Sequence, residues 1–467
     1  MPLKVLLPIQ EFSTLDLTLA DAAADIEASV KELEIANFPY SKTTDALCSR
    51  SFRMLESLTI QWTLENNSLN AMWPEGNILL LTKDCAPRLR RLAYSSGSLA
   101  SLDILWSLTH LALHNVMESR IHEGITTMLS ACHALESLHL EGVTDFDHQL
   151  NWAGVYRPLP TPSPLLGCRL LRRVALVLLK ARLASFILSL LAEQSTLAVQ
   201  LLDMRLVGDA NVSYPPRLLP GGISKAIIGR YPRPSWPSER GPPFVWGITL
   251  SSLEHTVRRT GEALTDIIDM LYREGAGSGA FEGVQELWLS DVFPTTCDES
   301  NTLHSPEANQ VRALIQCMSG LECVTLVNQF QSPWTGAPSS LRLLPDARED
   351  GRFGPRPATV RIAYGYGEYV VERWSEPQPK LVTAVPPLDL TGILEELATG
   401  AYSYIEKLVI EVPRRVDVDM GDIERRRAHV GTVELRVVDS TPTMELPEYC
   451  AEPAAILGDE PWPYRLW

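Results

Sequence analysis

A six-residue pattern of apolar residues, L-x-x-L-x-L, recurs along this chain and constrains its fold more than any other feature. The pattern is clearest in Leu135–Leu140, which follows a stretch that begins near Ile121. In that stretch Ile125, Met128 and Leu129 recur at helical spacing, whereas the end of the leucine pattern alternates apolar and polar residues, as a half-buried strand does. A helix and a strand this short cannot bury their apolar faces alone. The unit therefore needs similar neighbours stacked on either side.

The rest of the chain supplies such neighbours. The same pattern predicts strands at Val30–Ile35, Leu55–Ile60, Leu89–Tyr94, Leu108–Leu113, Leu171–Leu176, Val284–Leu289, Leu321–Leu326 and Ile405–Ile410. Helices are predicted between several of them, the clearest over Leu183–Leu191, where apolar residues form one wide stripe. The strands lie roughly 20 to 40 residues apart, within or above the range of leucine-rich repeats. The sequence thus predicts an α/β fold: one irregular leucine-rich-repeat solenoid over residues 1–438, with a curved parallel sheet and outer helices.

Two Pro-rich insertions and a tail interrupt or end this array. The insertions lie at about 214–244 and 332–357. Because proline lacks an N–H group and has a fixed φ, we predict neither a helix nor a central strand in the first insertion. A repeat strand is expected to resume at Val245–Leu250. The tail, residues 439–467, is acidic and contains proline, so we expect it to be loosely held.

Charge and cysteine content limit the function classes. The net charge is −16, which argues against nucleic-acid binding because that needs a concentrated basic face. The densest basic run, Arg425–Arg427, is interpreted as a solvated turn. The eight cysteines show no C-x-x-C spacing, and Cys132 is expected to pack as a small buried hydrophobe. Without a signal-peptide pattern or an apolar run of about 18 residues, we expect a reducing compartment, the cytoplasm or the nucleus, and no membrane association.

The form C-x-x-L-E-S-L-x-L at Cys132–Leu140, preceded by a helix, resembles the cysteine-containing leucine-rich repeats of F-box proteins. It looks especially like the F-box/leucine-rich-repeat proteins of mushroom-forming fungi, over Asp21–Ile410 loosely and Trp106–Val143 best. In that family an N-terminal F-box engages the adaptor subunit of a cullin-based (SCF-type) ubiquitin ligase. Leu7–Glu11 resembles the start of an F-box, but a first repeat strand at Val30 leaves too few residues for a complete one. The resemblance implies a protein-interaction scaffold, with a ligase substrate receptor carrying a truncated or divergent F-box as the alternative.

No motif in the chain predicts catalysis. His110 and His114 are four residues apart on a predicted strand, a span of about 13 Å, which is too far to chelate one ion. The glycine run Gly275–Gly279 follows a predicted helix and precedes a strand, so we interpret it as a helix end and turn, not as a phosphate loop. We therefore predict that the protein is not an enzyme and has no cofactor or metal.

The third and fifth positions of each leucine pattern point away from the core, because side chains alternate across a strand. In the middle strands these positions carry small residues beside arginine and histidine, which predicts a shallow, mildly basic groove suited to a peptide with acidic side chains. Ordinary solvated positions are the alternative. For Trp288, an exposed anchor and a side chain covered by a flanking loop both remain open. The candidate partner-binding residues are Arg91, His110, Ser137, His139, Arg173, Glu286 and Trp288.

Overall fold

A computed structural model describes a large part of the chain. The described residues are 3–8, 29–36, 51–60, 82–95, 102–114, 116–118, 121–145, 167–192, 199–207, 222–232, 244–261, 281–290, 306–328, 341, 343–348, 354–364, 369–371, 380–382, 391–414, 420–440, 442–447 and 450. The sequence predicted one array over residues 1–438. The structure divides the chain into two compact units, residues 1–218 with 452–467 and residues 219–451, which are described separately.

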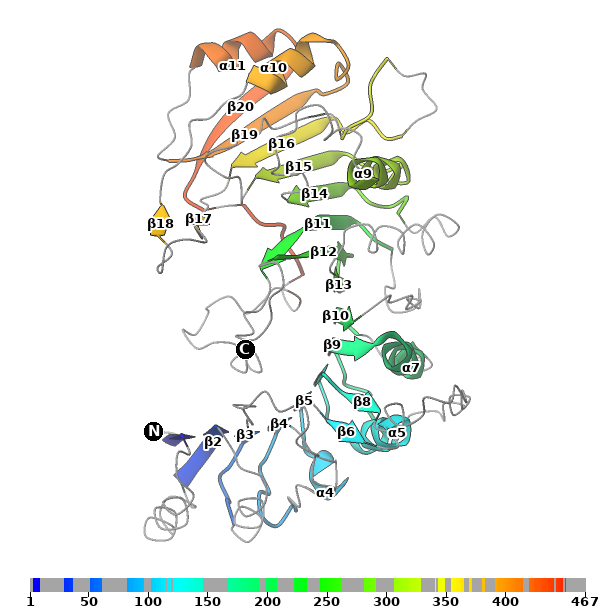
Figure 1. Cartoon of the computed structure of the whole chain (residues 1–467), viewed down its shortest axis with the longest axis vertical. Helices are drawn as coiled ribbons and strands as arrows, with labels where there is room; N and C mark the ends of the chain where they lie inside the picture. The colour runs from blue at the N-terminus through cyan, green and yellow to red at the C-terminus, as the bar shows by residue number, and fades with distance from the viewer. Residues whose placement is uncertain are drawn as a thin grey trace. The chain divides into compact units, whose positions relative to one another are not determined.

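In the first unit, parallel strands lie side by side in the order in which they occur along the chain (Figure 1). They are β1 (Leu3–Pro8), β2 (Val30–Ala36), β3 (Ser57–Ile60), β4 (Arg91–Ser95), β5 (His110–His114), β7 (Ser137–Glu141), β9 (Arg173–Lys180) and β10 (Leu201–Val207). The pattern leucines Leu58, Leu92, Leu111 and Leu138 pair in turn across β3, β4, β5 and β7. All four are buried, so the strands predicted from the leucine pattern are confirmed here.

Helices cover the leucine face of this unit. They are α4 (Leu102–Leu105), α5 (Ile121–Ala131) and α7 (Ala181–Ala192). The buried residues of α5 are Ile121, Ile125, Met128 and Leu129, the stripe expected from their helical spacing. Helix α7 packs on β9 and β10. A small parallel pair, β6 (Met117–Glu118) and β8 (Thr144–Asp145), lies beyond β5 and β7.

In the second unit the strand order is partly out of chain order. It runs β13 (Thr256–Gly261), β12 (Phe244–Ser251), β11 (Lys225–Pro232), β14 (Glu286–Ser290), β15 (Cys323–Asn328), β16 (Thr359–Tyr364), β19 (Lys407–Pro413) and β20 (Thr432–Val438). The pairs from β11–β14 through β19–β20 are parallel. The pairs β11–β12 and β12–β13 are antiparallel.

Strand β11 overturns the expectation that the first Pro-rich insertion holds no central strand. The prolines of that insertion lie before and after residues 225–231, so a proline-free stretch remains. Ala226 and Ile228 are fully buried there, and β11 pairs on both sides. The parallel arrangement predicted for Val245–Leu250 is also wrong. A turn at Ser252–His255 returns the chain at once, and so short a connection joins only antiparallel strands.

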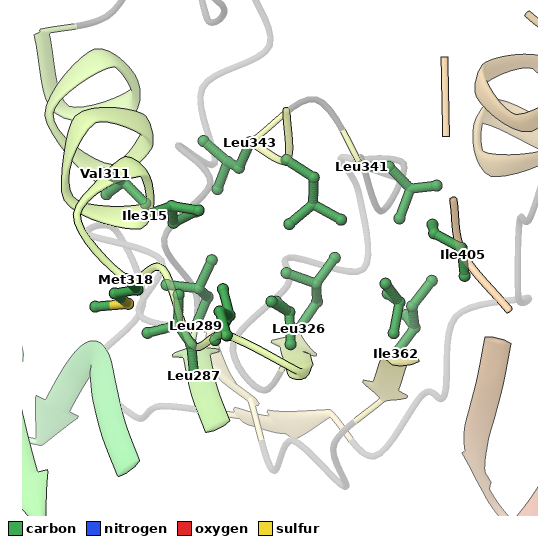
Figure 2. Packing of buried hydrophobic residues seen from close by; sticks show 14 of the residues in the cluster. Leu287, Leu289, Val311, Ile315, Met318, Leu326, Leu341, Leu343, Ile362 and Ile405 are labelled. Carbon is green, nitrogen blue, oxygen red and sulfur yellow. The ribbon is translucent and has the colours of Figure 1, made fainter. Parts of the chain in front are cut away.

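The core of the second unit lies between helix α9 (Pro306–Gln316) and the leucine face of the sheet. Figure 2 shows Val311 and Ile315 of α9 close to Leu287 and Leu289 of β14. Leu341 and Leu343, from the second predicted insertion, point into the same cluster above Leu326 and Ile362 (Figure 2). These two leucines of the insertion thus pack on the same face of the sheet that α9 covers at β14.

The remaining elements of this unit are α10 (Thr391–Ala398), α11 (Met420–Arg427) and a hairpin of β17 (Tyr369–Val371) and β18 (Lys380–Val382). Arg425–Arg427 form the last turn of α11, not a solvated turn. Arg426 is fully buried, whereas its two neighbours are exposed. The chain is an α/β protein with mostly parallel, open sheet and few helices. Within the described ranges, no helix combines the length and apolar character needed to cross a membrane.

Candidate functional site

The strand register brings several candidate residues of the first unit into one line. We call the sheet face opposite the pattern leucines the front face. On it, Ser57, Arg91, His110, Ser137 and Arg173 pair in turn across β3, β4, β5, β7 and β9; we call them the first row. All except Ser57 are partly exposed. The strip therefore brings together four of the predicted partner-binding residues, Arg91, His110, Ser137 and Arg173, on adjacent strands.

The first row carries positive charge from arginine more than from histidine. Arg91 Nη2 lies 2.8 Å from Glu32 Oε1, across the small side chain of Ser57. Burial lowers the pKa of His110 below its ordinary value; nearby Glu136 opposes this, and the charges of Arg91 and Arg173 add to the lowering. The imidazole of His110 is accordingly neutral near pH 7.

The fifth position of the leucine pattern is buried on β4, β5 and β7. Ala93 and Ala112 are fully buried, and His139 is 5% exposed. The expectation that His139 contacts a partner at an exposed position is therefore wrong. Its side chain does leave the leucine core, but on the front face it packs among other residues of β5 and β7.

His139 belongs to a buried polar cluster with His114 and Glu141. The register pairs His114 of β5 with Glu141 of β7, and His139 lies two residues before Glu141 on the same face. His114 Nδ1 donates to Glu141 Oε2 at 2.7 Å, and His139 Nε2 lies 3.5 Å from the same oxygen. The two imidazole rings are tilted, with centroids 5.1 Å apart. All three side chains are almost fully buried.

The electrostatics of this cluster favour a charged carboxylate beside neutral imidazole. Burial by itself would raise the pKa of Glu141, but hydrogen bonds and charge interactions with His114 and His139 lower it below its ordinary value. Burial lowers the pKa of His139, and its hydrogen bond to Glu141 only partly offsets this. The negative charge of Asp203 also acts on His139. Asp203 lies on β10 and pairs with Ala175 of β9, which in turn pairs with His139.

Sequence reasoning missed this cluster because it compared His110 with His114 along one strand. In the structure His114 instead faces residues of the next strand. The signal was present: aligning the leucine pattern of Leu108–Leu113 with that of Leu135–Leu140 places His114 opposite Glu141. Cross-strand register, and not spacing along the chain, decides which side chains meet.

The front face of the second unit is different, because the chain's own tail covers the part of it around Trp288. Trp288 is 4% exposed and packs with Val327, Ala363 and Met444. Its Nε1 donates to Glu286 Oε1 at 2.6 Å, and the guanidinium of Arg361 lies over its ring at 5.2 Å from the centroid. Of the two alternatives for Trp288, the covered side chain holds and the exposed anchor does not.

The covering residue, Met444, lies in the tail that was expected to be loosely held. Leu446 also packs against this front-face cluster. Lys225 Nζ donates to the backbone oxygen of Glu445 at 3.4 Å. The part of the tail that the structure describes between 442 and 447 thus lies on β14, β15 and β16 through two apolar side chains.

Charged residues around Trp288 are paired within the protein. Arg361 Nη2 lies 2.9 Å from Oε1 of the buried Glu411, and Arg436 Nη1 lies 3.4 Å from the same oxygen. Glu286, one of the predicted partner-binding residues, is 3.3 Å from Lys225 Nζ. The accessible charge of Glu286 is therefore already partly neutralised.

Two buried cysteines of the first unit, Cys132 and Cys168, form neither a nucleophilic site nor a disulfide. Cys132 and Cys168 are free and buried. Burial raises the pKa of each thiol to about 12. They therefore remain protonated and unreactive near neutral pH. For Cys132 this confirms the predicted role as a small buried hydrophobe.

No protein-family model matches this chain, and no curated protein is significantly similar to it. The resemblance of Cys132–Leu140 to F-box/leucine-rich-repeat proteins stays a prediction. The geometry of the two front faces is therefore the basis for proposing a function.

Proposed function

We propose that this chain is a protein–protein interaction scaffold of the leucine-rich-repeat type, and that a partner binds along the first row. The observation that carries the proposal is the register of Arg91, His110, Ser137 and Arg173 on adjacent parallel strands. These side chains are partly exposed, whereas the pattern leucines on the opposite face of the same strands are buried. A strip of this kind offers side chains to a partner without disturbing the core.

The repeat character supports the solenoid part of the proposal. In the first unit neighbouring strands follow one another in chain order, and the equivalent leucines of successive strands pair with one another in register. Stacked repeats of this type contact only their neighbours and present an extended surface. In the second unit the strands from β14 to β20 that belong to the large sheet again follow chain order, and β11 pairs in parallel with the first of them.

The chemistry of the first row suits an extended peptide with acidic side chains. Arg91 and Arg173 are separated by three strand spacings, or about 14 Å. In an extended peptide, side chains four residues apart lie on one side and are separated by about 13 Å. Two carboxylates at that spacing would each meet a guanidinium, which binds carboxylates through two parallel hydrogen bonds. Binding would compete with Glu32 for Arg91.

A charge-reversal experiment tests this proposal. The probe is a fluorescent peptide of extended character with glutamates four residues apart, followed by anisotropy. The double variant Arg91→Glu with Arg173→Glu should bind it at least about tenfold more weakly, equivalent to 1.4 kcal/mol. The matched control is Arg88→Glu with Arg169→Glu, which makes the same charge change at exposed positions outside the first row. Equal weakening by both pairs, or unchanged binding by the first pair at an unchanged melting temperature, would contradict the proposal.

The role of substrate receptor in an SCF-type ubiquitin ligase is a second proposal that rests on the sequence resemblance. Leu7 and Pro8, from the stretch that resembles an F-box start, lie in β1, where Leu7 pairs with Ile35. Size-exclusion chromatography with the ligase adaptor subunit separates the two roles. Stable one-to-one co-elution favours the receptor, and separate elution favours the scaffold without a ligase.

A further inference from the structure

Three potential metal ligands converge on the front face of the first unit. His114, His139 and Glu141 each offer one nitrogen or oxygen atom, and these atoms all lie within 4.8 Å of one another. Their positions are set by backbone that is paired on both sides, since β5 and β7 are interior strands of the unit. A site built on strands holds its geometry better than one built on loops.

The two donor-atom distances that involve Glu141 lie on either side of the spacing in a tetrahedral ion site. Ligands about 2.0–2.1 Å from a tetrahedral zinc ion lie about 3.3 Å from one another. His139 Nε2 and Glu141 Oε2 are already 3.5 Å apart. His114 Nδ1 and Glu141 Oε2, at 2.7 Å, are at hydrogen-bond distance and would need to open by roughly 0.6 Å to reach that ligand spacing.

The charge balance of the cluster also calls for a cation. The side chain of Glu141 is 2% exposed, and its Oε1 accepts no hydrogen bond from any residue that the structure describes. A buried carboxylate without full hydrogen bonding is costly, and buried charges are normally paired or bound to a metal. Asp203 adds a second negative charge that acts on His139. A divalent ion at the cluster would offset both carboxylates.

We propose that His114, His139 and Glu141 form a binding site for one divalent transition-metal ion of the zinc class. Two imidazole nitrogens and one carboxylate oxygen suit zinc and its neighbours in the first transition row, whereas calcium and magnesium prefer oxygen ligands alone. The ion would connect β5 to β7 and replace the hydrogen bond between His114 and Glu141. Three protein donors leave a fourth tetrahedral position for water or another ligand.

Metal binding to the full chain tests the site directly. After treatment with a chelator, the protein is dialysed against Zn²⁺ and the bound metal is quantified. The wild type and the control His133→Gln, which changes an exposed histidine of the same unit, should bind one ion per chain with equal affinity. His114→Gln and Glu141→Gln should each weaken binding by at least the roughly 10–100-fold loss that follows changes in outer-shell partners. No binding by the wild type, or equal binding by all four proteins, would overturn the proposal.

A spectroscopic measurement on the wild type keeps the test decisive where a cluster variant fails to fold. Co²⁺ added to the chelator-treated protein should give the visible bands of a four- or five-coordinate ion with nitrogen and oxygen ligands. An intense sulfur-to-cobalt charge-transfer band would place the ion at a cysteine such as Cys132 or Cys168 and would refute the assignment. The absence of any visible band at saturating Co²⁺ would refute it as well.

Discussion

The front faces of the two units start from the same strand pattern and bury different chemistry. The first unit buries His114, His139 and Glu141. The second buries Trp288 beneath Met444 and pairs the buried Glu411 with Arg361. In the second unit the protein itself supplies the cation for the buried carboxylate, whereas in the first unit two imidazoles contact it. The leucine pattern thus determines the core face of both units, whereas the few residues between the leucines decide the chemistry of the front face.

The leucine face should be equivalent in the two units, and matched core truncations test this. Leu138→Ala in the first unit and Leu326→Ala in the second remove fully buried side chains from pattern positions. Each should reduce the free energy of unfolding by about 2–5 kcal/mol because of lost burial and the cavity left behind. Urea denaturation followed by circular dichroism measures the loss. A cost below 1 kcal/mol in one unit alone would show that the two leucine faces are not equivalent.

The front faces should differ in their dependence on the tail. Met444→Ala removes an apolar side chain that covers Trp288 and should cost about 2 kcal/mol, near the lower end of the range for buried Met→Ala changes because the site lies on one side of the sheet. Thr443→Ala, at an exposed neighbouring position, is the control and should change stability little. Proteolysis within the tail should become faster in Met444→Ala only. Equal stability of the two variants would mean that Met444 is not a packing residue.

The ion pair of the second front face should matter less than its apolar contacts. Glu411→Gln keeps the shape of the side chain and removes the charge that faces Arg361, whose own side chain is partly exposed to water. We expect a cost of about 1–2 kcal/mol, since a hydrogen bond to a charged group is replaced by a neutral one. Glu395→Gln at an exposed position of α10 is the matched control. An increase in stability on Glu411→Gln would show that desolvation of the carboxylate outweighs its pairing.

The smallest effect is expected from a surface carboxylate at the edge of the second unit. Hydrogen bonds from Arg436 and Lys407 lower the pKa of Glu434 from 4.5 to about 2. A carboxylate whose pKa is lower in the folded state stabilises that state above pH 4.5 and loses this contribution as the pH falls toward 2. The wild type should therefore lose slightly more stability than Glu434→Gln in this window, as urea titrations at several pH values would measure. High salt should remove the difference because the group is exposed; a difference that persists in salt would contradict the assignment.

Much of the fold could be predicted from the sequence because apolar periodicity is a local property. The strands at Leu135–Leu140 and Leu321–Leu326 and the helix at Ile121–Ala131 follow from residues that are close together in the chain. The antiparallel arrangement of β11 to β13 could not be predicted in this way. The prolines on either side of residues 225–231 predicted an insertion without a central strand, but these proline-free residues form a buried one. Arg426 was likewise assigned to a solvated turn because its burial depends on how α11 packs.

The candidate sites, like the fold, could be predicted only in part. The sequence alone determined that Arg91, His110 and Arg173 leave the leucine core, because side chains alternate along a strand with a period of two. Only the tertiary structure decided that His139 is buried, that Met444 covers Trp288, and that His114 meets Glu141 from 27 residues away. Alternation specifies the face on which a side chain lies. What that side chain contacts depends on the register of the neighbouring strands and on segments distant in the chain, neither of which a local pattern encodes.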